Sequence, residues 1–254
     1  LILDGNDLGT KASLGSDRTR TISEVFPWRG PKTLGTNSCR VCEIPVRSGE
    51  PVQEWTLEAR VFNDGVAFCY CVPRTNGVVI DGEATTWSLP REATLWFQTN
   101  TDDYEGEYHA ARADAVPLEE VVRDKKRSTR IGLPMTVVYP DRQFGLLSEA
   151  CLYRFSGLSL RAAGDARFRA VFEDDPKGWA HSGRVVSPWR VLVLAKDLNG
   201  LVNSDLIAAL GEPPDPRLFP DGMNTSWIRP GKAPCTWMVY GNDGAQWNRQ
   251  KQWV

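Results

Sequence analysis

The sequence predicts a mainly β protein, most economically a large β-sandwich of antiparallel strands. Three observations lead to this prediction: short apolar runs with period-two alternation, 17 Pro and 22 Gly that punctuate those runs, and few helical patterns. Hydrophobic residues make up 41% of the 254 residues, which is enough for a real core. Intrinsic disorder is therefore excluded for most of the chain.

Two β-hairpins are the clearest local predictions. Residues 55–72 alternate apolar and polar side chains around Asn63-Asp64-Gly65, a sequence typical of a tight turn. Residues 135–139 and 144–149 flank a second turn-like segment, residues 140–143. Residues 167–172 alternate again, and the fuller apolar run 189–195 fits a strand buried on both faces.

Helices are expected at few places. Residues 117–125 fit one or two helical turns, with acidic residues at the start and a basic one at the end. Residues 203–210 fit a helix or a strand. The Pro-rich residues 211–217 predict a rigid linker, so we place a domain boundary between a sandwich domain, residues 1–220, and a second segment, residues 221–254.

Charge and hydropathy argue against two classes of partner. The formal net charge of −2 leaves no electrostatic footprint for a nucleic acid or an anionic membrane. The longest apolar run in the second half, Val191–Ala195, is far shorter than the roughly 20 residues of a membrane-spanning helix. We therefore expect no nucleic-acid partner and no membrane partner.

Candidate chemistry is sparse. The motifs HExxH, GxxxxGK, GxGxxG and GxSxG are absent. Glu149 ends an apolar strand, so its carboxylate must be exposed, paired or bound to a cation, and exposure is the simplest of the three. The 10 Trp could offer flat surfaces to sugars, although core filling explains most of them.

The cysteines allow a metal site or none. Cys39 and Cys42 form a CxxC pair, and Cys69 and Cys71 point to one face of a predicted strand. Four thiols could bind zinc if these segments were adjacent. We favour the simpler interpretation of small buried side chains, or one disulfide at most, because CxC is not a usual zinc spacing.

Five stretches spread along the chain resemble the N-terminal part of glycoside hydrolase family 97. The most specific is Asn224-Thr-Ser-Trp-Ile-Arg-Pro-Gly-Lys232, and the others are Val61–Tyr70, Ile131–Thr136, Ser148–Tyr153 and Trp189–Arg190. The resemblance implies a large antiparallel super β-sandwich (galactose-mutarotase-like). It also implies that residues 221–254 hold the first strand and partial helix of a truncated catalytic (β/α)₈ barrel.

The resemblance also implies an activity. The family hydrolyses α-linked glucosides or galactosides, with inversion in some members and retention in others, so an α-linked oligosaccharide is the expected substrate. Its catalytic carboxylates lie on barrel strands beyond Val254, so we expect no catalytic residue in this chain. The resemblance further implies an excerpt of a longer protein, a periplasmic or secreted location, and the family's own catalytic barrel as the partner of this domain.

The resemblance implies site residues as well. The family binds calcium, and Glu149, in a segment similar to a family ligand segment, is the expected metal ligand. Trp227, Lys232 and Trp237 are the expected substrate-binding residues, although a structural role for Lys232 is equally compatible. The alternatives are a free-standing carbohydrate-binding β-sandwich and a structural sandwich of a cell-surface protein.

Overall fold

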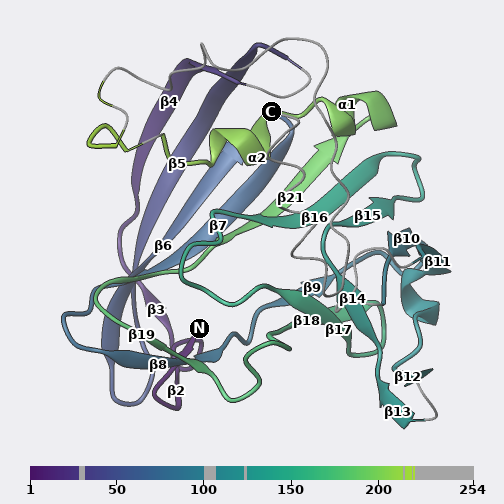
Figure 1. The fold of residues 1–254 in the computed structure, drawn as a ribbon, viewed down its shortest axis with the longest axis horizontal. Helices are drawn as coiled ribbons and strands as arrows, with labels where there is room; N and C mark the ends of the chain where they lie inside the picture. The colour runs from purple at the N-terminus through teal and green to yellow at the C-terminus, as the bar shows by residue number, and fades with distance from the viewer. Residues whose placement is uncertain (29–31, 100–106, 123–124, 214, 219, 221–254) are drawn as a thin grey trace, which may run out of the picture. The chain divides into compact units, whose positions relative to one another are not determined.

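The computed structural model describes residues 1–28, 32–99, 107–122, 125–213, 215–218 and 220. Within them, Leu1–Glu212 form one compact unit that consists mainly of antiparallel strands (Figure 1). The predicted fold class is confirmed. The predicted barrel segment, residues 221–254, lies outside the described residues. No helix in the described part is both long and apolar enough to cross a membrane.

An 11-stranded antiparallel sheet dominates the unit, with strand order β11-β10-β15-β16-β21-β7-β6-β5-β3 and with β4 and β20 paired to β5 and β7. Its strands are β3 (Ser13–Leu14), β4 (Arg18–Pro27), β5 (Leu34–Ser48), β6 (Gln53–Phe62), β7 (Gly65–Val72), β10 (Thr94–Phe97), β11 (His109–Arg112), β15 (Met135–Val138), β16 (Phe144–Ala150), β20 (Val185–Val186) and β21 (Trp189–Ala195).

Smaller sheets complete the unit. One four-stranded sheet has the order β19-β8-β1-β2, another has the order β14-β17-β18-β9, and β12 pairs with β13 alone. Their strands are β1 (Ile2–Leu3), β2 (Asn6–Asp7), β8 (Val78–Gly82), β9 (Thr86–Ser88), β12 (Glu119–Val122), β13 (Lys125–Ser128), β14 (Arg130–Gly132), β17 (Ser159–Ala162), β18 (Arg167–Val171) and β19 (Trp179–His181).

The two faces of the large sheet are covered differently. One face shares the main core with the four-stranded sheets, and residues such as Leu95, Val137 and Leu147 meet Ile80 and Phe168 there. The other face carries a smaller apolar cluster, defined here as the second core: Ala67, Cys69, Cys71, Ala150, Trp189, Val191, Val193, Leu206 and Leu210. Period-two alternation along each strand assigns successive side chains to these two faces.

Helical structure is minor. In the part of the chain that the structure describes, it comprises α1 (Leu198–Val202), α2 (Leu206–Ala209) and a 3₁₀ turn at Ala113–Ala115. The helix predicted over residues 117–125 is wrong, because β12 and β13 form a hairpin there. The two adjacent valines, 121 and 122, are β-branched, which favours a strand over a short helix. The undecided residues 203–210 contain α2.

Both predicted hairpins are confirmed, and so is the strand at residues 167–172. β21 lies between β16 and β7, and it is buried on both faces at Trp189–Val191 but not near its end, where Leu194 is exposed. Gly65 begins β7 where β21 comes very close. A Cβ at Gly65 would lie 2.3 Å from the carbonyl oxygen of Leu192. The close approach of β21 therefore requires glycine at this position.

The substitution Gly65→Ala tests this packing. We expect it to lower the free energy of unfolding by about 2 kcal/mol or more, because the added methyl must displace backbone in a packed sheet. Gly77→Ala is the matched control, since the nearest atom to its Cβ would be 3.7 Å away. Urea unfolding of both variants measures the difference, and equal midpoints would contradict the packing argument.

Candidate functional site

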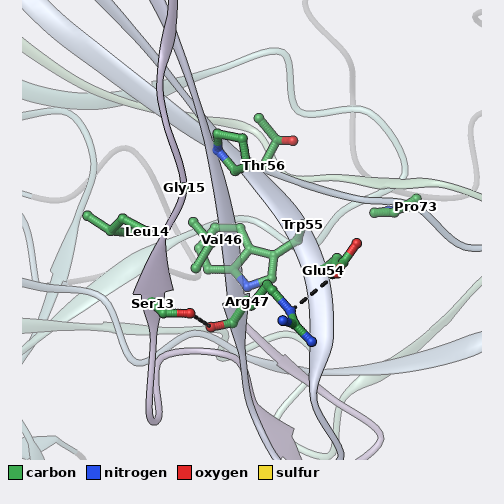
Figure 2. Close-up of a pocket in the computed structure, with 10 residues that line it drawn as sticks. Ser13, Leu14, Gly15, Val46, Arg47, Glu54, Trp55, Thr56 and Pro73 are labelled. Carbon is green, nitrogen blue, oxygen red and sulfur yellow. Dashed lines mark hydrogen bonds and ion pairs between the residues drawn. The ribbon is translucent and has the colours of Figure 1, made fainter.

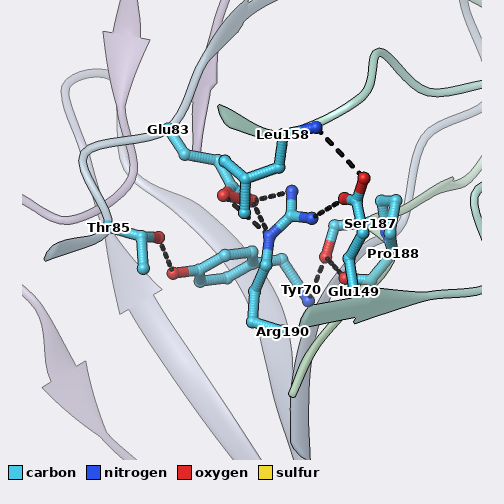
Figure 3. Close-up of polar contacts among 8 residues, drawn as sticks. All are labelled: Tyr70, Glu83, Thr85, Glu149, Leu158, Ser187, Pro188 and Arg190. Atoms are coloured by element: carbon cyan, nitrogen blue, oxygen red, sulfur yellow. Dashed lines mark hydrogen bonds and ion pairs between the residues drawn. The ribbon is translucent and has the colours of Figure 1, made fainter. Parts of the chain in front are cut away.

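The candidate site is a buried ion cluster formed by Arg190, Glu83 and Glu149 (Figure 3). Arg190 lies on β21 and Glu149 lies opposite it on β16, so the two side chains share one face of the large sheet. Glu83 follows the end of β8 in a neighbouring sheet. The cluster therefore links two sheets of the sandwich through one guanidinium.

Arg190 is fully enclosed by its partners. Its Nε donates to both carboxylate oxygens of Glu83 at 3.1 and 3.0 Å, and Nη2 donates to Glu83 Oε1 at 2.7 Å. Nη1 donates to Oε2 of Glu149 at 2.7 Å. The side chains of Arg190 and Glu83 are 0% exposed. The guanidinium also lies 5.8 and 5.9 Å from the ring centroids of Phe155 and Phe172.

Glu149 forms the more accessible edge of this cluster. Its side chain is 15% exposed, and its Oε1 accepts a hydrogen bond from the backbone N–H of Leu158 at 3.1 Å. Burial raises the pKa of this carboxyl, and the neighbouring Arg190 opposes the shift. The simple exposure expected from the sequence is wrong, because β16 lies inside the sheet and its end is covered.

The electrostatics of the cluster suit a bound cation. One guanidinium and two carboxylates give the three side chains a formal charge of −1. Each oxygen of Glu149 uses one lone pair in the hydrogen bonds described, so further lone pairs remain for a cation at the exposed edge. Calcium takes six to eight oxygen ligands, so the described residues fit one ligand of such a site and not a complete one.

Tyr70 lies beside the cluster without serving as a base. Its hydroxyl is 2.7 Å from Oγ1 of Thr85, and its backbone N–H donates to Oγ of Ser187 at 3.0 Å (Figure 3). Burial raises the pKa of Tyr70 to about 12, so the phenol stays protonated at neutral pH. Its role here is to pack and to hydrogen-bond.

Several hollows open on the unit, and two of them differ clearly in their lining. The larger, of about 610 Å³, is lined by charged residues including Asp81, Arg161, Arg169 and Glu173, and Glu83 contributes to its wall. The smaller, of about 390 Å³, is lined largely by apolar side chains around Trp55, with Arg47 and Glu54 paired at 3.2 Å (Figure 2). The larger hollow offers several charged groups of the kind that orient a polyol.

The predicted site residues have different outcomes. Glu149 is placed in the cluster, whereas Trp227, Lys232 and Trp237 lie outside the described residues. Of the other tryptophans, Trp55 and Trp189 are buried and Trp87 and Trp179 pack against the main core, as core filling predicts. Sequence reasoning missed Arg190 and Glu83. A charged residue inside the apolar run 189–195 was the available signal for Arg190.

The four-thiol zinc site does not form among the described residues. Cys39 and Cys42 are three positions apart on β5, so they face opposite sides of the sheet. Cys39, Cys42, Cys69, Cys71 and Cys151 are all free thiols, so the possible disulfide does not form between them. Cys69 and Cys71 do share one face, as expected, with their sulfurs 3.9 Å apart.

The substitution Arg190→Met tests the cluster. It should lower the free energy of unfolding by about 3–5 kcal/mol, because it leaves Glu83 buried without its partner. Adding Glu83→Gln should recover part of that loss by removing the uncompensated charge. Arg47→Met, which breaks an exposed ion pair, should change little. Chemical unfolding of the three variants is the measurement, and equal effects of Arg190→Met and Arg47→Met would refute the assignment.

Comparison with known proteins places the chain in a family. The family model described as "Glycosyl-hydrolase 97 N-terminal" matches residues 1–213. A probable retaining alpha-galactosidase from Streptomyces bingchenggensis is 28% identical over 246 residues, 96% of this chain and 35% of that protein. The retaining alpha-galactosidase of Bacteroides thetaiotaomicron is 22% identical over 210 residues, 73% of this chain and 31% of that protein.

Solved structures share the fold. A glycoside hydrolase family 97 enzyme from Pseudoalteromonas sp. strain K8, in complex with acarbose, has a TM-score of 0.67 at 19% identity and covers 80% of this chain and 30% of its own. A beta-arabinopyranosidase also reaches 0.67, at 17% identity, over 80% of this chain and 35% of its own. The chain spans about a third of the length of the curated relatives it matches. The match over residues 1–213 confirms the resemblance: the chain belongs to the glycosyl-hydrolase 97 N-terminal family.

Proposed function

We propose that this chain is the non-catalytic N-terminal domain of an α-glycosidase that hydrolyses α-linked galactosides. The family match over residues 1–213 supports the domain assignment, and the names of both curated relatives support the galactoside. In this proposal the sandwich supports a catalytic barrel and contributes to the wall of its substrate pocket. The proposed partner of this domain is therefore the catalytic barrel, and the proposed substrate of the complete enzyme is an α-linked oligosaccharide.

The observation on which the proposal rests is the fixed carboxylate of Glu149. Arg190 and the backbone N–H of Leu158 hold its two oxygens, and Glu83 holds Arg190 from the other side. Because the carboxylate of Glu149 is already held in place, less conformational entropy is lost when a cation binds to it. We propose that Glu149 supplies one calcium ligand and that residues outside the described part supply the others. Calcium would provide fixed positive charge close to the sugar.

The cluster is not arranged for acid–base catalysis by this chain alone. A glycosidase needs two carboxyl groups on either side of the bond that breaks. Glu83 and Glu149 instead converge on one guanidinium, and the Glu83 side chain is fully enclosed. No substrate oxygen could lie between them, which agrees with catalytic carboxylates elsewhere in the complete enzyme.

The substitution Glu149→Gln in the complete enzyme tests the calcium proposal. We expect calcium affinity to fall by about tenfold or more, because the amide loses the charge while keeping the shape. Hydrolysis of 4-nitrophenyl α-galactoside at limiting calcium should fall with it. Glu54→Gln, at an exposed surface carboxylate, is the control and should leave both unchanged. Calorimetric calcium titration gives the affinity, and an unchanged value in Glu149→Gln would defeat the calcium role.

A second experiment separates this function from a free-standing sugar-binding module. The isolated chain should neither hydrolyse α-galactosides nor bind galactose or melibiose measurably in calorimetry, since its charged hollow lacks an exposed aromatic platform. Tight binding by the isolated chain would favour the module instead. Activity of the complete protein on α-glucosides, with none on α-galactosides, would overturn the galactoside assignment alone.

A further inference from the structure

A second cluster of ligand-type side chains lies on the opposite face of the large sheet from Arg190. Cys69 and Cys71 lie on β7, and Glu58 lies directly opposite Cys69 on β6. Arg190 lies opposite Phe68, the neighbour of Cys69, so its side chain projects from the other face. The two thiols belong to the second core, so this cluster is independent of the calcium proposal.

The three side chains are close and largely enclosed. Their ligand atoms all lie within 4.8 Å of one another. Cys69 is 1% exposed and Cys71 is 6% exposed, and the Glu58 side chain is 18% exposed. An ion or a water molecule would therefore enter from the side of Glu58, because the second core encloses the sulfurs.

The spacing of the sulfurs matches a tetrahedral metal. Two thiolates about 2.3 Å from one tetrahedral zinc ion lie about 3.8 Å apart. The sulfurs of Cys69 and Cys71 are 3.9 Å apart. A disulfide would require them to close to about 2.0 Å, against the extended backbone that holds them on one face. The strand therefore presents these thiols in a chelating arrangement.

The donor atoms of the cluster favour a cation that prefers sulfur. The hydrogen bond between the two thiols lowers the pKa of Cys71 but, together with burial, raises the pKa of Cys69, so a bound ion must displace the Cys69 proton. Arg60 donates to Oε1 of Glu58 at 3.1 Å and stacks on Trp189 at 4.5 Å, which fixes the carboxylate. Thiolates favour zinc-like ions, whereas calcium prefers oxygen.

We propose that Cys69, Cys71 and Glu58 form a binding site for zinc or a similar thiophilic divalent cation. The two sulfurs and one carboxylate oxygen supply three ligands, and a water molecule completes the tetrahedron from the Glu58 side. Binding releases the thiol protons that remain on the two cysteines. The bound ion would tie β6 to β7 at the edge of the second core.

Metal titration of the reduced chain tests this site. Zinc is titrated in competition with a chromophoric chelator, and cobalt serves as the spectroscopic probe. We expect one bound zinc and a thiolate-to-cobalt charge-transfer band. Cys71→Ser should weaken zinc binding by more than about 100-fold and weaken the band, and Glu58→Gln should weaken binding about tenfold. Cys39→Ser is the matched control, because Cys39 is a buried free thiol outside the cluster.

The outcomes are distinct. Absence of zinc uptake by the reduced wild-type chain, or uptake unchanged in Cys71→Ser, overturns the proposal. If Cys71→Ser does not fold, X-ray absorption of the zinc-loaded wild type decides the question. Sulfur and oxygen neighbours around zinc support the site, and a shell of oxygen and nitrogen alone refutes it.

Discussion

The burial of one positive charge constrains much of this domain. Arg190 lies on a strand in the middle of the large sheet, and its side chain has no access to water. An unpaired charge there would cost several kcal/mol, and the carboxylates of Glu83 and Glu149 offset this cost. Glu149 meets this need through the register of β16 with β21, and Glu83 meets it through the approach of the β8 sheet. The neutralisation of this one guanidinium therefore depends on both strand register and sheet packing.

Under the proposed function, the same cluster explains how a supporting domain can hold a metal ligand without catalysing a reaction itself. Of the two carboxylates, Glu83 is committed to neutralising Arg190, and Glu149 is held at an edge with some exposure. A carboxylate fixed in this way can bind a cation together with ligands from another part of a longer protein. The relatives' greater length fits this division between a supporting sandwich and a reacting domain.

The two faces of the large sheet carry two different sets of potential metal ligands. The face toward the main core places carboxylate oxygens around a guanidinium that donates to them, and the opposite face gathers two thiols and one carboxylate beside the second core. Hard and soft cations select between such donor sets by their ligand preference. Alternation along β21 and β7 produces this separation, because neighbouring residues on a strand project to opposite sides.

The sequence alone determined what depends on neighbours along the chain. Alternation and turn residues predicted both hairpins and the mainly β class, and the ordered stretches predicted the family. The local signal failed at residues 117–125, where acidic residues at the start and a basic residue at the end suggested a helix but strand pairing prevailed. The residues around Glu149 favoured simple exposure, because nothing nearby in sequence indicated its partner Arg190.

Only the tertiary structure decided which distant residues meet. Glu83 and Arg190 are 107 residues apart, and Arg190 and Glu149 are 41 apart, so no local pattern links them. Cross-strand register likewise brought Glu58 to Cys69. Local patterns fix the direction of a side chain on its strand, whereas the identity of its partner follows from strand order and sheet packing, which are properties of the whole fold.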